Sequence, residues 1–180
     1  MRALATPVCR HWSGWWPAKS DRAPMSVKRL IHDRAGEALV LAQFSLVSAL
    51  GIMAFQALAP GKISWSVLCT AFGASFLGLW TLKVNPPGNF NIRPHPKLGG
   101  RLVEVGPYRW IRHPMYSAVL LLGLAAALSA RNSLSAWLLY FALCLVMNAK
   151  AGLEERLMKL SHEGYAAYCQ KRRRFIPRVY

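Results

Sequence analysis

Residues 38–61 read ALVLAQFSLVSALGIMAFQALAPG, a run of 24 residues that contains no Asp, Glu, Lys, Arg or His. A membrane-spanning helix needs roughly 20 mostly apolar residues, with about 17 as the lower limit. Three more uncharged runs follow, of 20, 17 and 18 residues, at 63–82, 114–130 and 132–149. The sequence therefore predicts an all-α integral membrane protein with about four transmembrane helices, at about 36–58, 63–82, 115–130 and 134–149.

These spans are expected to form two helical hairpins. Only a few residues join the first span to the second, and Arg131-Asn132-Ser133 turns the third span into the fourth. Short connections make consecutive helices antiparallel neighbours. The fourth helix should continue past the membrane, because leucines recur at helical spacing from residue 153 to residue 160.

Segments rich in Lys and Arg alternate along the chain with segments poor in them. The chain has 23 Lys and Arg against 7 Asp and Glu, which gives a net charge of +16. Counted before, between and after the predicted spans, the Lys and Arg number 7, 1, 6, 1 and 8. Cytoplasmic loops carry the excess of Lys and Arg, so both termini are predicted to be cytoplasmic. Nucleic acid, the partner that such a charge otherwise indicates, is not expected.

The chain divides into a basic N-terminal arm, 1–35, and a membrane domain, 36–180. The arm mixes Arg, Trp and Pro and has no apolar core of the 7–15 residues that a signal peptide requires. It is interpreted as disordered or interfacial, and a native start at Met25 is the alternative. We expect a bacterial inner membrane, because the chain is short and carries no retention signal.

The spacing of cysteine and histidine indicates no metal site. Cys9, Cys69, Cys144 and Cys169 are scattered without a CxxC or CxxH pattern. The histidines other than His113 have no paired ligand within helical reach. Neither a disulfide framework nor a zinc site is predicted.

Three polar clusters are predicted on the cytoplasmic side of the membrane, at 101–116, 150–155 and 165–177. In the first, Arg109, Arg112 and His113 precede Pro114, which suits the first position of a helix. A helix N-terminus with cationic donors nearby suits a carboxylate or a phosphate. A headgroup anchor of basic and aromatic residues is the alternative for this cluster.

The second and third clusters combine carboxylates, tyrosines and arginines. Lys150 and Glu154 share one helix face, while Glu155 is turned about 100° away, so only one carboxylate is expected to point inward. That carboxylate could bind an ammonium group or the hydroxyls of a ribose, or it could form a surface pair with Lys150. In the third cluster the arginine run 172–174 is interpreted as binding anionic lipid.

These clusters carry motifs that resemble a known family. In chain order they are Phe90-Asn91, Leu102-Val103, Gly106-x-Tyr108, Arg112-His113-Pro114-x-Tyr116, Glu154-Glu155 and Pro177. On these residues the chain is similar to the isoprenylcysteine carboxyl methyltransferases and their relatives, the phospholipid methyltransferases. The motifs cover about half of the chain, and the order of the RHPxY and EE motifs is fairly specific.

The resemblance implies a helical membrane fold whose cytoplasmic end binds S-adenosylmethionine, with Glu154 as the acidic contact. A substrate-binding Arg of the carboxyl methyltransferases is replaced by Lys150, which keeps the charge but lacks the fork that grips a carboxylate. The candidate cofactor-binding residues are Arg101, Leu102, Val103, Tyr108, Arg112, His113, Pro114, Met115, Tyr116, Glu154 and Glu155. The candidate catalytic residues are His113, Tyr116, Lys150 and Arg174.

The expected function is methylation of a membrane-associated acceptor by a carboxyl methyltransferase-like enzyme that uses S-adenosylmethionine. A carboxylate acceptor would be placed by Lys150 or Arg174, whereas an amine or thiol would first lose a proton to His113, Tyr116 or Glu155. A phospholipid or small-thiol methyltransferase on the same scaffold is the first alternative. The second is a non-catalytic membrane protein with a lipid-binding basic tail.

Overall fold

The computed structural model describes residues 34–58, 63–89, 101–130, 133–162 and 164–180. The predicted basic arm lies outside the described residues except for Arg34 and Ala35, and the Phe90-Asn91 motif lies outside them as well. The regular elements of the described part are all helices, and one isolated bridge lies outside them. Its helices are α2 (Arg34–Leu58), α3 (Trp65–Val84), η1 (Gly106–Arg109), α4 (Pro114–Ser129), α5 (Leu134–Ser161) and α6 (Tyr165–Lys171).

The long helices coincide with the predicted spans to within a few residues. Helices α2, α3 and α5 are long and apolar enough to cross a membrane, and α4, with 16 residues, is a shorter apolar helix. Helix α5 runs on to Ser161, so the predicted continuation beyond the fourth apolar run is confirmed. Phe55, Trp65 and Phe72 are 79%, 81% and 74% exposed. Large apolar side chains on outward faces are typical of helices surrounded by lipid.

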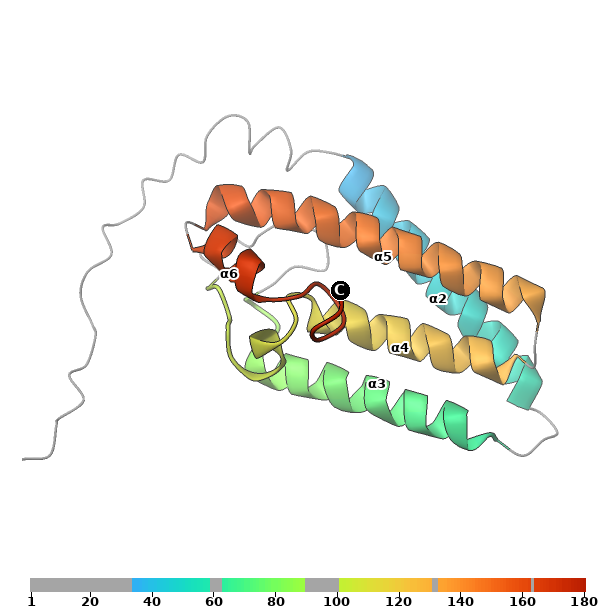
Figure 1. Ribbon diagram of the computed structural model, residues 1–180. Helices are drawn as coiled ribbons and strands as arrows, with labels where there is room; N and C mark the ends of the chain where they lie inside the picture. Colours follow the sequence, from blue (N-terminus) through green and yellow to red (C-terminus); the bar gives the residue numbers. More distant parts are fainter. Residues whose placement is uncertain (1–33, 59–62, 90–100, 131–132, 163) are drawn as a thin grey trace, which may run out of the picture.

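Helix α4 lies at the centre of the bundle (Figure 1). It packs against α3 on one side and against α2 and α5 on the other. Helices α2 and α3 run in opposite directions, as their short connection predicts. The expected packing of these two helices against each other is wrong, because α2 packs mainly on α5 and α3 mainly on α4. The close fit of α3 on α4 involves small residues, since a Cβ on Gly78 would lie 3.7 Å from the Cβ of Ala118. Small residues at such contacts let helix backbones approach closely in a membrane.

The core is formed where α2, α4 and α5 meet. Leu50, Leu143 and Met147 are at most 1% exposed and pack with Ala127 and Ala136. Gly123 lies in the same layer, where an added Cβ would come within 2.7 Å of Leu143 Cδ2. This tight layer fixes the position of α5, which carries the acidic residues of the predicted site.

We expect Leu143→Ala to lower the free energy of unfolding by about 2–4 kcal/mol, because the change removes buried methyl groups and leaves a cavity. The matched control is Leu138→Ala on the same helix, where the side chain is 60% exposed. Thermal unfolding in detergent measures both. Equal midpoints for the two variants would contradict the assignment of this layer as the core.

Candidate functional site

The C-terminal tail, residues 172–180, lies at the polar end of the bundle. There it packs beside residues 110–113, the segment that leads into α4 (Figure 1). Ile111 and Arg173 form an isolated parallel bridge. The backbone N–H of Arg112 donates to the carbonyl of Arg173 at 2.8 Å, and that of His113 donates to the carbonyl of Arg174 at 3.1 Å. The structure therefore brings the first and third clusters together, although they lie about sixty residues apart in the sequence.

Helix α6 also contacts the part of the chain that precedes α4. The Tyr168 hydroxyl donates to the carbonyl of Tyr108 at 2.8 Å, and the side chains of Tyr165 and Tyr168 are buried. Burial raises the pKa of both phenols above the ordinary value, so they stay protonated at neutral pH. The interpretation of the arginine run as a lipid-binding surface needs a correction, because Arg174 turns inward and only Arg173 is exposed.

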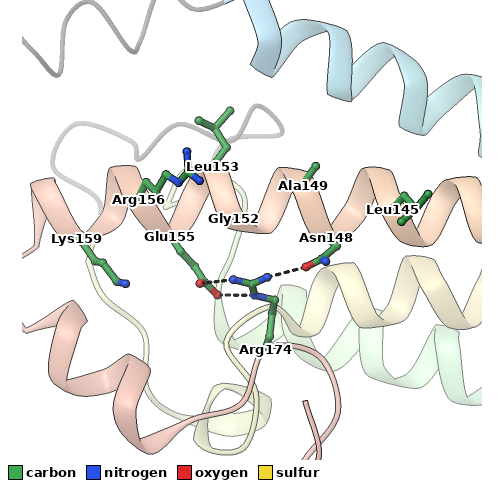
Figure 2. Close-up of a pocket in the computed structure, with 9 residues that line it drawn as sticks. All are labelled: Leu145, Asn148, Ala149, Gly152, Leu153, Glu155, Arg156, Lys159 and Arg174. Carbon is green, nitrogen blue, oxygen red and sulfur yellow. Dashed lines mark hydrogen bonds and ion pairs between the residues drawn. The ribbon is translucent and has the colours of Figure 1, made fainter.

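The carboxylate of Glu155 is the centre of the cluster. It accepts from Arg112 Nε at 2.9 Å, from Arg174 Nη2 at 2.8 Å and lies 3.1 Å from His113 Nε2. Figure 2 shows Arg174 reaching both Glu155 and Asn148 of α5. The hydrogen bond to Glu155 raises the pKa of Arg174 further above its ordinary value. One carboxylate from α5 thus joins the segment before α4 to the C-terminal tail.

Glu154 faces the other side of the same histidine. Its Oε2 accepts from the Tyr116 hydroxyl at 2.6 Å and lies 3.7 Å from His113 Nδ1. The expectation that only one of the two carboxylates points inward is therefore wrong. His113 lies between them, so a turn of about 100° still leaves both in contact with its ring. Glu154 keeps a side-chain exposure of 29%, against 8% for Glu155, and is the carboxylate that a ligand can reach.

Lys150 lies deeper in the bundle than the sequence suggests. It is 2% exposed, its Nζ donates to Gln43 Oε1 of α2 at 2.6 Å, and the same atom lies 5.1 Å from the centre of the Tyr116 ring. Sequence reasoning missed Gln43. The sequence does contain a signal for this residue, because Gln43 is an amide within an apolar span, and a polar side chain in a membrane helix needs a partner.

Two further missed residues hold the segment before η1. Asn85 Nδ2 donates to the Tyr108 hydroxyl at 2.9 Å, and Asn89 Nδ2 donates to Asn85 Oδ1 at 2.8 Å. Asn89 Oδ1 in turn accepts from the backbone N–H of Arg101 at 2.7 Å. Burial raises the pKa of Tyr108, so this phenol also stays protonated. These contacts link the backbone of Arg101 to the Tyr108 hydroxyl through the two asparagines.

The remaining candidate residues lie around this cluster. Pro114 occupies the first position of α4, as predicted, and His113 is the residue that caps it. Pro114 is buried, Met115, Leu102 and Val103 are half-buried, and Arg101 is exposed. Within the described ranges, no three His, Cys, Asp or Glu side chains are arranged to hold a metal ion. The arrangement offers an accessible carboxylate, a phenol and an imidazole, which suit a cationic or hydroxyl-bearing ligand.

Comparison with models of protein families places residues 62–163 in the family described as phospholipid methyltransferase. This match covers more than half of the chain and includes the RHPxY and EE motifs. No curated protein and no solved structure matches the chain.

Replacing Glu155 tests whether its carboxylate holds the C-terminal tail on α5. We expect Glu155→Gln to destabilise the protein by about 3–5 kcal/mol, because it leaves two half-buried arginines without their counter-charge. Hydrogen exchange should rise at residues 165–176, where the tail loses its contact with α5. Glu104→Gln, at an exposed carboxylate, is the control. Unchanged protection of the tail would show that Glu155 does not hold it.

The buried pair of Lys150 and Gln43 lends itself to a double-mutant cycle. We expect Gln43→Leu alone to destabilise the protein, because it leaves a buried ammonium without its oxygen partner. Adding Lys150→Met should restore most of the loss, since both polar groups are then gone. Unfolding midpoints in detergent measure the cycle. Purely additive losses would mean that the two side chains do not interact.

Proposed function

This chain belongs to the phospholipid methyltransferase family, and from that premise we propose that it transfers a methyl group from S-adenosylmethionine to a membrane-associated acceptor. The observation that carries the proposal is the position of Glu154. Its accessible carboxylate is held by the Tyr116 hydroxyl beside His113, at the polar end of a bundle of apolar helices.

The residues at this end fit such a cofactor in their chemistry. S-adenosylmethionine, when bound, supplies a methyl group carried on a positively charged sulfur. Glu154 would accept from its ammonium group or its ribose hydroxyls, and the Tyr116 hydroxyl would hold that carboxylate in place. Tyr108 and Arg101, which Asn85 and Asn89 link, would contact the cofactor together with Leu102 and Val103.

For this reaction the main task of the protein would be to position the acceptor and the cofactor relative to each other. In such a transfer the acceptor's lone pair would form the bond to the methyl carbon as the carbon–sulfur bond breaks with its electrons going to sulfur, so the residues around Glu154 would have to hold acceptor and cofactor in a fixed mutual orientation. A protonated acceptor must also lose a proton. Glu155 is occupied by two arginines and Tyr116 donates to Glu154, so we assign that role to the Nδ1 atom of His113.

The contacts of Lys150 and Arg174, the two cations that could place a carboxylate acceptor, favour an amine or a thiol acceptor instead. Lys150 donates to Gln43 inside the bundle, and Arg174 is bound to Glu155 and Asn148. A carboxylate acceptor would need one of them free to place it. We therefore rank a phospholipid amine above a prenylcysteine carboxylate, with a small thiol as the alternative.

Glu154→Gln should weaken the binding of S-adenosylmethionine about 10-fold or more, because a carboxylate that accepts from a charged donor is replaced by a neutral amide. Calorimetry on the detergent-solubilised protein measures the affinity. The control is Glu37→Gln, an exposed carboxylate near the start of α2. Unchanged affinity in Glu154→Gln would defeat the assignment.

The acceptor is identified by incubating the protein with S-adenosylmethionine labelled in its methyl group and with total membrane extract. Label in an aminophospholipid supports the preferred acceptor, and label in a small thiol supports the alternative. Label on a prenylated peptide would restore the carboxylate. A protein that binds no S-adenosylmethionine and labels nothing would fit the non-catalytic membrane protein.

A further inference from the structure

A cavity of about 580 Å³ lies against the outer face of α5 near its polar end. Asn148, Gly152, Arg156 and Lys159 of α5 line it, together with Arg174 of the tail (Figure 2). The site proposed for methyl transfer uses a different face of the helix, because neither Lys150 nor Glu154 lines this cavity.

The cavity carries an excess of positive charge. Arg156, Lys159 and Arg174 line it, and Glu155 is the single carboxylate among the lining residues. That carboxylate is already shared by Arg112, Arg174 and His113. Arg156 and Lys159 are exposed and three residues apart, so they are neighbours on one helix face. Arg156 and Lys159 are therefore the exposed charges of the cavity, while the charge of Glu155 is already neutralised by its partners. This balance favours an anionic ligand.

The other end of the cavity is apolar. Leu145, which lines it, is 72% exposed on the part of α5 that is apolar enough to lie in a membrane. Gly152 lies between the apolar and the cationic ends, and a Cβ there would meet nothing within 4 Å. Leu145 and Lys159 are fourteen positions apart, about 21 Å along the helix. A cationic end and an apolar end at this separation match the headgroup and upper chains of a phospholipid.

We propose that this cavity binds one anionic phospholipid, with its phosphate between Arg156 and Lys159 and an acyl chain along Leu145. Basic side chains near a membrane surface each favour anionic lipid, and here the cavity holds them around one hollow. The site does not depend on the proposed methyl transfer, and an occupant here is a bound lipid rather than the acceptor.

The test is native mass spectrometry of the full chain in detergent, titrated with phosphatidylglycerol, with phosphatidylcholine or with inorganic phosphate. The wild-type protein should retain one phosphatidylglycerol, and neither phosphatidylcholine nor phosphate should occupy the site at the same concentration. Arg156→Gln with Lys159→Gln should lower the affinity about 10-fold or more. Gly152→Leu should do the same by filling the hollow, since an added Cβ at this position meets nothing within 4 Å.

The matched control is Lys83→Gln with Lys171→Gln, which removes the same charge at two exposed positions outside the cavity. It should leave phosphatidylglycerol binding unchanged. An equal loss in the control, equal binding of phosphatidylcholine, or unaltered binding in both cavity variants would overturn the proposal. Binding of S-adenosylmethionine should be the same in all of these variants, so this proposal and the proposed methyl transfer can fail separately.

Discussion

The polar end of this protein depends on the carboxylate of Glu155, which Arg112, His113 and Arg174 share. These partners come from the segment before α4 and from the C-terminal tail, while Glu155 itself belongs to α5. A buried carboxylate with two arginines is stable only while all partners stay in place. That requirement fixes the imidazole of His113, and the fixed imidazole in turn faces Glu154. The site proposed for methyl transfer is therefore positioned by Glu155 and its two arginines, to which the proposal assigns no chemical step.

The adjacent glutamates consequently have different tasks. Glu155 is buried and saturated with donors, whereas Glu154 keeps access to a ligand and is held by one phenol. The same division appears around α5 as a whole. Its inner face holds Lys150 against Gln43 in the bundle, and its outer face lines the cationic cavity with Arg156 and Lys159. One helix thus contributes to both proposed ligand sites, which differ in the charge of the ligand that they favour.

The helical architecture could be predicted from the sequence because the length of an uncharged run is a local property. The spans, the extension of α5 and Pro114 at the start of α4 all follow from such local patterns. The motifs around His113 and Glu154 were found in the same way. Contacts between distant segments could not be predicted, since hydropathy does not specify partners. The pairing of Gln43 with Lys150, the asparagines beneath Tyr108 and the docking of the tail on Ile111 are of this kind.

The central claim, that S-adenosylmethionine binds at the carboxylate of Glu154 beside Tyr116 and His113, is tested most directly by photo-crosslinking. The protein in detergent is irradiated with methyl-labelled S-adenosylmethionine, digested, and the labelled peptides are sequenced. The account predicts label within residues 101–116 or 150–155, and loss of that label when S-adenosylhomocysteine competes. Competed label confined to α3, or no competed label at all, would contradict it.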